Sequence, residues 1–259
     1  MANVLVDETS LQNIANAIRE KNGTENTYKP SEMPQAILDI QTGGGGDNWY
    51  DTFWDNYQDY GNRVNYASVN TGAAFSGSGW NDITFKPKYD IVPEDSAWYL
   101  FAGSNISDFS NLDIKLDFSN CQDMRGCFSL AKATHIGVVN AGSVLYNWLQ
   151  QSFYGCSNLK TIDKLILPTS TTVTGYLEAF RNCYALEDIT VEGKFIKSIS
   201  FSDSSKLTTA SVDSIINALY DLTGQDSQTL TVHKAVFGRM SDEQKAFVTS
   251  KNWTLASSK

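Results

Sequence analysis

One pattern recurs through the middle of the chain and restricts the folds open to it: a phenylalanine followed three residues later by a small residue. The pattern begins at Phe75, Phe101, Phe128, Phe153, Phe180 and Phe201. The intervals are 26, 27, 25, 27 and 21 residues, which lie within the range of about 20–50 residues typical of solenoids. A unit this short cannot cover its own apolar surface, so we expect neighbouring units to cover one another.

The later copies of the pattern are the most complete. In residues 153–162 and 180–191 the small residue is followed by leucine and isoleucine at three-residue spacing. Leu186-x-x-Ile189-x-Val191 predicts a short apolar strand. Each copy therefore has a turn, a bulky phenylalanine, a small residue where units crowd together, and a strand that only a neighbouring unit can cover.

The cysteines are explained by the same pattern. Cys156 and Cys183 occupy the small-residue position of successive copies, which favours a ladder of small buried side chains over a redox pair. No cysteine lies in a C-x-x-C pair or near a histidine, which argues against a zinc site. The sequence leaves undecided whether Cys121 and Cys127, six residues apart, form a disulfide.

The flanks of the repeats have helical periodicity. Apolar residues at helical spacing predict a helix over 9–21, and Ser31 can cap a second one before the run of glycines at 43–46. We expect five parts: a helical attachment or oligomerisation module at 1–42, a glycine-rich linker at 43–47, an aromatic N-terminal capping helix at 48–66, a solenoid at 67–207 and a C-terminal α/β cap at 208–259.

Within the predicted C-terminal cap, helices and strands alternate. Apolar periodicity predicts a helix over 211–224, and 230–232 has the pattern of a strand. Ser241 and Gln244 form a capping box that opens a helix ending near Asn252, before a last strand over 253–256.

Charge and hydropathy exclude some functions. The formal net charge is −9, and the cations are scattered, so the basic surface that nucleic-acid binding requires is missing and we expect no such partner. No apolar run approaches the roughly 20 residues that cross a bilayer, and the N-terminus has no basic region followed by a long apolar one. We therefore expect neither membrane insertion nor a signal peptide.

Catalytic signals are missing as well. His135 and His233 are the two histidines, and neither has a carboxylate, cysteine or second histidine at a recognisable triad or ligand spacing. The common hydrolase, phosphate-loop and dinucleotide motifs do not occur. We predict no catalytic, cofactor-binding or metal-binding residues. The alternative left by the sequence is a pair of carboxylates from distant units that would hydrolyse a glycoside.

Aromatic residues are the candidates for binding, since they make up 12% of a chain with little charge. Several lie beside the repeated phenylalanines, where they would face solvent on the turn side of a solenoid. The predicted binding residues are Trp98, Tyr99, Tyr146, Trp148, Tyr154, Tyr176 and Tyr184.

The copies at 153–162 and 180–189 resemble the BspA-type leucine-rich repeat. Further blocks are similar to leucine-rich-repeat proteins encoded by phages and prophages of gut Firmicutes: 50–55 with 61–66, 85–91, 161–167, and 214–219 with 251–255. Residues 11–21, 31–34 and 37–40 are similar to a helical-hairpin module of phage tail and fibre proteins. The resemblance implies an α+β fold, namely a leucine-rich-repeat-like solenoid of short parallel strands with helical caps and a separate N-terminal helical hairpin.

The same resemblance implies a non-enzymatic role in the phage tail, with the protein made in the host cytoplasm. We expect residues 1–42 to join sister copies, by analogy as a trimer, and other virion proteins. The partner of the solenoid would be a polysaccharide or protein of the host surface. Alternatives are a purely structural or decoration protein of the virion, a bacterial surface adhesin of the same fold, and a carbohydrate-active enzyme.

Overall fold

The computed structural model describes residues 8–22, 29, 63–64, 74–87, 89–93, 96–146, 149–170 and 172–258. The chain divides into two compact units, Met1–Asn56 and Tyr57–Lys259. In the first unit, helix α1 (Glu8–Asn22) agrees with the helix expected over 9–21, and Ala15 and Ile18 are buried among its residues 11–20.

Several expectations fall outside the described residues. These are the second helix after Ser31, the glycine-rich linker at 43–47 and the aromatic capping helix expected at 48–66, apart from Arg63 and Val64, where the expectation is wrong because they form a strand, β1 (Arg63–Val64).

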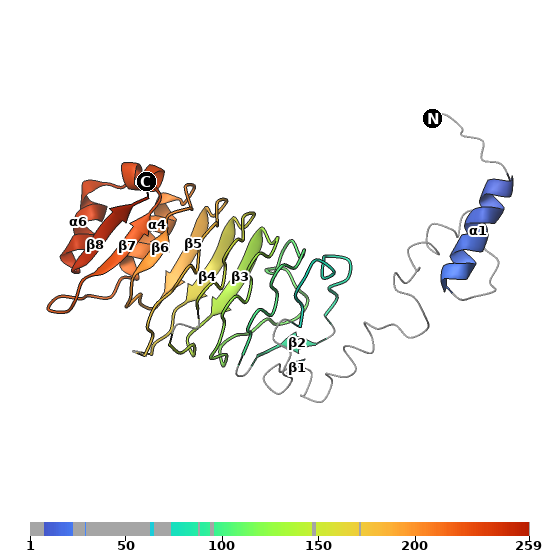
Figure 1. Ribbon diagram of the computed structural model, residues 1–259, viewed down its shortest axis with the longest axis horizontal. Coiled ribbons are helices and arrows are strands. Elements are labelled where there is room, and N and C mark those ends of the chain that lie inside the picture. The colour runs from blue at the N-terminus through green and yellow to red at the C-terminus, as the bar shows by residue number, and fades with distance from the viewer. Residues whose placement is uncertain are drawn as a thin grey trace. The chain divides into compact units, whose positions relative to one another are not determined.

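Short parallel strands form the sheets of the second unit (Figure 1). Strands β3 (His135–Asn140), β4 (Thr161–Ile166) and β5 (Asp188–Glu192) pair in chain order in one sheet. Strands β6 (Ile199–Phe201), β7 (Gln228–Val232) and β8 (Trp253–Ser257) pair in chain order in another. A two-residue pair joins β1 (Arg63–Val64) to β2 (Asp90–Ile91). Together with the helices, these strands give an α+β fold with parallel pairing.

The strand register places like side chains in columns. Ile136, Ile162 and Ile189 are aligned across β3, β4 and β5, and all three are buried. This agrees with the apolar strand predicted at 186–191, because alternate side chains of a strand point to one face. Isolated parallel bridges continue the pairing toward the N-terminus at Ile91–Leu116 and Asp108–His135.

All six repeated phenylalanines are buried, as expected, with at most 2% of any one exposed. Their rings form one continuous column. Centroids of successive rings, from Phe75 to Phe201, lie 5.3, 5.5, 5.7, 5.1 and 4.6 Å apart, with interplanar angles of at most 26°. Phenylalanines that are 21 to 27 residues apart in the sequence therefore contact one another directly.

Four of these phenylalanines lie in what we call the turn segments, residues 97–104, 124–131, 149–156 and 176–183. Each segment has i→i+3 backbone hydrogen bonds on both sides of the phenylalanine, for example Leu100 N–H to Ala97 O and Ser104 N–H to Phe101 O, both 3.1 Å. In the first three segments, the N–H groups of the phenylalanine and of the residues two before and two after it donate to the next segment: those of Tyr99, Phe101 and Gly103 donate to carbonyls of 125, 127 and 129.

Five of the six small residues that follow the phenylalanines are buried, whereas Ser78 is exposed, and the two cysteines among them are hydrogen-bond donors. Cys156 Sγ donates to Phe128 O and Cys183 Sγ to Phe153 O, at 2.9 and 3.0 Å. All four cysteines are free and buried, so the structure has no bridge between Cys121 and Cys127. Burial raises the pKa of Cys156 to about 12, which keeps the thiol protonated and able to donate.

Helix α4 (Thr209–Asn217) takes the place of a further strand beside β5. The N–H of Ile189 donates to Ser211 Oγ at 2.9 Å, and the N–H of Val191 donates to Ser214 Oγ at 2.7 Å. Serine hydroxyls thus accept two of the hydrogen bonds that a neighbouring strand would accept, and the sheet ends at β5.

The helix expected over 211–224 is shorter in the structure. It ends at Asn217, because the next residues pair in an extended conformation with the chain before β6: Leu219 forms a parallel bridge with Phe195, and Tyr220 N–H donates to Phe195 O. Gly224 has φ +78° in a later turn, so it does not close the helix.

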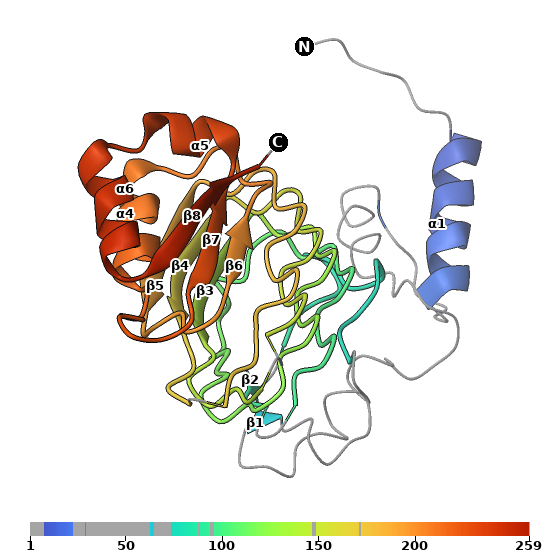
Figure 2. The same ribbon diagram turned by 60° about the vertical axis from the view of Figure 1, so that its left-hand side comes forward.

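The rest of the C-terminal region agrees more closely with the prediction. Helix α6 (Asp242–Ser250) has the capping box of Ser241 and Gln244, and it is followed by β8. Helix α5 (Lys234–Arg239) was not predicted, and the ring of His233 caps its N-terminus by accepting from Ala235 N–H. Helix α6 packs beside β8, and α4 packs beside β5 and α6 (Figure 2).

Candidate functional site

The turn segments present a surface of aromatic, aliphatic and charged side chains. We call it the turn face and define it as the solvent-accessible side chains of the turn segments together with Tyr184. Its exposed large apolar residues are Trp98, Leu130, Leu177 and Tyr184. Exposed apolar residues that gather on one side of a structure are a common mark of an interaction surface.

The backbone of the turn face has an unusual requirement. In every turn segment, the residues two before and two after the phenylalanine have positive φ, as the third residue of a type II turn requires. Glycine adopts this conformation without strain, and it fills the position at Gly103, Gly126 and Gly155. The other positions hold side chains, with φ between 51° and 62°: Tyr99, Leu130, Gln151, Glu178 and Asn182.

Two of these side chains lie over glycines of the next segment. A Cβ placed on Gly126 would lie 2.7 Å from Cε1 of Tyr99, and one on Gly155 would lie 2.5 Å from Cδ2 of Leu130. Gly126 and Gly155 therefore leave room for the Tyr99 ring and the Leu130 methyl groups beside them.

One part of the turn face has two groups of polar and aromatic side chains from adjacent segments, which we together call the Tyr154 cluster: Gln151, Tyr154, Glu178 and Arg181 form one, and Asn182 and Tyr184 form the other. Gln151 Nε2 donates to Glu178 Oε2 at 2.9 Å, and the other oxygen of Glu178 pairs with Arg181. The Arg181 guanidinium carbon lies 6.0 Å from the centroid of the Tyr154 ring. Tyr184 Oη donates to Asn182 Oδ1 at 2.7 Å.

The carboxylate of Glu178 is fully ionised in this arrangement at neutral pH. Hydrogen bonds from Gln151 and Arg181, together with the positive charge of Arg181, hold the pKa of Glu178 below its usual range. The Tyr154 cluster therefore offers planar donors and acceptors that are held in place by one another.

A second group lies at the other end of the turn face. The rings of Trp98 and Tyr99 meet edge to face with centroids 5.2 Å apart. Arg125, from the next turn segment, pairs with Asp123 at 2.6 Å, and its Nε donates to the same carboxylate. This hydrogen bond and the charge of Asp123 raise the pKa of Arg125.

The structure distributes the predicted binding residues unevenly. Trp98, Tyr99, Tyr154 and Tyr184 all lie on the turn face, and Tyr146 is 49% exposed in a loop outside it. Trp148 lies outside the described residues.

The expectation that Tyr176 faces solvent is wrong. Tyr176 is 4% exposed, and its ring packs edge to face against Phe195 with centroids 5.3 Å apart. Burial raises the pKa of its hydroxyl to about 12. The residue belongs to the core because it precedes Phe180 by four positions, at the first residue of its turn, whereas Trp98 precedes Phe101 by three.

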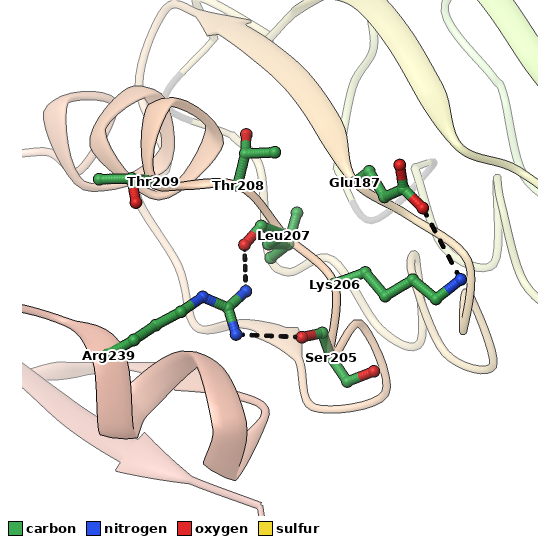
Figure 3. Close-up of a pocket in the computed structure, with 7 residues that line it drawn as sticks. All are labelled: Glu187, Ser205, Lys206, Leu207, Thr208, Thr209 and Arg239. Atoms are coloured by element: carbon green, nitrogen blue, oxygen red, sulfur yellow. Dashed lines mark hydrogen bonds and ion pairs between the residues drawn. The ribbon is translucent and has the colours of Figure 1, made fainter.

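A depression of about 580 Å³ lies at the start of α4 (Figure 3). Its charged groups are engaged within it: the Arg239 guanidinium donates to the backbone oxygens of Ser205 and Leu207. Lys206 Nζ lies 3.7 Å from Glu187. These contacts join α5 to the chain before α4, so we interpret the depression as a structural junction.

Sequence reasoning missed a polar network around His135, at the start of β3. Its Nε2 lies 2.7 Å from Asp163 Oδ1, and its Nδ1 lies 3.1 Å from Ser110 Oγ and 4.0 Å from Asp108 Oδ2. Asp108, His135 and Asp163 are spaced like the phenylalanines, at 27 and 28 residues. That spacing is the signal that could have predicted the contact.

The network has the components of a Ser-His-Asp triad, but with the ring nitrogens exchanged, since Nδ1 rather than Nε2 faces the serine. The hydroxyl of Ser110 also lies 2.6 Å from Asp108 Oδ1. A hydroxyl has one proton, so a proton given to Asp108 is not available to His135. We therefore interpret the network as structural: its hydrogen bonds hold β3 to β4 and to the chain at Ser110.

Desolvation acts to raise the pKa of Asp108, but hydrogen bonds from Ser110 and Asn111 and the charge of His135 outweigh it and lower the pKa. Beside the network is a hollow of about 140 Å³, lined by Phe109, Ser110, Leu112, Ile114, Leu116, Ile136, Gly137 and Val138.

Within the described part of the chain, no group of three or more histidine, cysteine or acidic side chains is placed to hold a metal ion. None of its helices has the length and apolar character needed to cross a membrane. No family model matches this chain, and neither a curated protein nor a solved structure matches it.

Proposed function

We propose that this chain is a non-enzymatic virion protein of a phage or prophage that binds the surface of the host cell. In this proposal residues 67–207 form a leucine-rich-repeat solenoid that presents the binding surface. Residues 1–42 join the chain to the tail and to sister copies in a trimer, after synthesis in the host cytoplasm.

The solenoid part of the proposal is supported by contacts between residues one repeat apart. The stacked phenylalanine rings, the bonds between turn segments and the pairing of β3, β4 and β5 all join residues separated by about one interval of the sequence pattern. Units that contact only their neighbours give an extended surface whose side chains can vary while the core is kept.

The binding role depends on one observation, the side chains at positive φ on the turn face. Tyr99, Leu130, Gln151 and Glu178 occupy backbone positions where glycine would avoid strain of roughly 1 kcal/mol each. Strained residues that persist are a reason to look for function at that site. Several copies on one particle would strengthen weak contacts, because later binding events become intramolecular.

The test is binding of the fluorescently labelled chain to a panel of Gram-positive gut bacteria, with and without residues 1–46. We expect at least one strain to bind both forms, and we expect phage particles made with the truncated form to lack the protein. A chain that binds no strain but is incorporated into particles would instead be a structural or decoration protein. Binding without any incorporation of the full chain would favour an adhesin.

A further inference from the structure

We propose that the Tyr154 cluster binds an uncharged glycan, with a sugar ring against Tyr154 and Tyr184 and its hydroxyls bonded to Gln151, Glu178 and Asn182. This inference rests on the proposed host-binding function and assigns it a site and a class of ligand.

The backbone of the turn face does not suit an added peptide strand. An extended peptide binds a sheet edge through unpaired N–H and C=O groups. In the segment centred on Phe153, the N–H groups of Gln151, Phe153 and Gly155 already donate to oxygens of the next segment. The N–H groups of Ser152, Tyr154 and Cys156 donate within the segment. A ligand at this surface would therefore be recognised by side chains rather than by the backbone.

The charges of the cluster do not suit an ionic ligand. Arg181 is paired with Glu178, and the nearby Asp203 carboxylate accepts the N–H of Asn182 at 2.8 Å. An anionic polymer would meet two carboxylates beside one guanidinium, and a cationic one would have to displace Arg181 from its partner. Like-charge contacts at an interface select against a partner, so the cluster favours an uncharged one.

The side chains that remain match the chemistry of a sugar. A pyranose has an apolar face of C–H groups, which packs on an aromatic ring, and a rim of hydroxyls that both donate and accept. Tyr154 is half-buried and Tyr184 is 54% exposed, so both rings are accessible. Gln151, Glu178 and Asn182 provide amide and carboxylate groups near them, already fixed by mutual hydrogen bonds.

The strain of the backbone points to the same cluster. Gln151, Glu178 and Asn182 all have positive φ, at 56°, 52° and 62°. Each of the three also provides a polar group to the cluster. Asparagine adopts this conformation with little strain, so Gln151 and Glu178 are the strained positions of the cluster, and both supply hydroxyl-binding groups.

The experiment uses the full chain on an array of uncharged oligosaccharides of glucose, galactose, rhamnose and N-acetylglucosamine, with heparin, hyaluronate and lipoteichoic acid as charged probes. We expect binding to an uncharged glycan that changes less than about twofold between 50 and 500 mM salt, because no net charge is involved. Binding to the charged probes alone, or to no uncharged glycan, would overturn the proposal.

Matched variants locate the site. Tyr154→Ala and Tyr184→Ala should each weaken glycan binding by about tenfold or more, which corresponds to about 1.4 kcal/mol. Tyr220→Ala, a change at an exposed tyrosine outside the turn face, should leave it unchanged. Equal loss in all three variants, or no loss in the first two, would contradict the assignment. If bacteria still bind the chain but uncharged glycans do not compete, this inference fails while the proposed function stands.

Discussion

The turn segments and the β3–β5 strands lie in the same stretch of chain, yet they constrain their residues differently. Each position of the strands has an extended backbone that any residue can adopt, so the sequence requirement is the alternation that buries Ile136, Ile162 and Ile189. The turn segments require positive φ at two fixed positions. A non-glycine residue at these positions adopts a conformation that the backbone disfavours. The turn segments therefore show more clearly than the strands which side chains serve a purpose other than folding.

The largest loss of stability should come from a change in the column of phenylalanine rings, which supports both regions. Phe128→Ala removes a fully buried ring that contacts Phe101, Phe109, Phe118 and Phe153. We expect a loss of about 3–5 kcal/mol in the free energy of unfolding, measured by chemical denaturation. Phe247→Ala, at a partly exposed ring on α6, is the control; equal losses would show that the column has no special role.

A pair of glycine substitutions compares the two regions directly. Gly126→Ala in a turn segment combines positive φ with a contact of 2.7 Å to the Tyr99 ring, so we expect a loss of about 2 kcal/mol. Gly137→Ala in β3 meets its nearest atom at 3.4 Å and needs no positive φ, and should stay within about 1 kcal/mol of the parent. Denaturation midpoints that rank the two in the opposite order would refute this account.

Acid should lower the stability of the β3–β5 region by protonating Asp108, which contacts His135 of β3. Because its pKa is lowered in the folded protein, its contribution to stability is present above the unfolded value of about 3.9 and is lost as the pH falls through the folded value. Asp108→Asn should therefore destabilise the protein at pH 7, by an amount that declines as the pH falls below about 3.9. Unfolding of both forms from pH 7 to pH 3 measures this; a constant difference would contradict it.

The smallest effect is expected at Leu130 on the turn face. Leu130→Gly relieves roughly 1 kcal/mol of backbone strain but removes the contact of a half-exposed side chain with Gly155. The two terms nearly cancel, so we expect a change in unfolding free energy within about 1 kcal/mol of zero. A loss above about 2 kcal/mol would place Leu130 in the core and weaken the contrast between the two regions.

Much of the fold could be predicted because its signals are local or periodic. The burial of the phenylalanines, the small residues at Cys156 and Cys183, and the capping box of α6 all follow from spacing and residue type. The end of α4 could not be predicted, because Leu219 pairs with Phe195, 24 residues away. Helix α5 has six residues, too few for its periodicity to stand out.

The candidate site was predicted less completely. Four of the seven predicted aromatics lie on the turn face, but the burial of Tyr176 depends on a shift of one residue within its turn. The partners of His135 are distant in sequence and adjacent only through the parallel register of the strands. The positive-φ positions were not visible from composition, since glycine occupies some of them and large residues occupy others.

The hydroxyls of Ser211 and Ser214 have a consequence for how such a chain can change in length. They end the β3–β5 ladder with side chains of a helix rather than with another strand. Duplicating or deleting one unit upstream of β5 would leave this terminus, and everything after it, chemically unaltered. In the proposed solenoid, recombination between neighbouring units would lengthen or shorten the molecule in steps of about one ring-to-ring spacing, while α4 would still end the strand ladder.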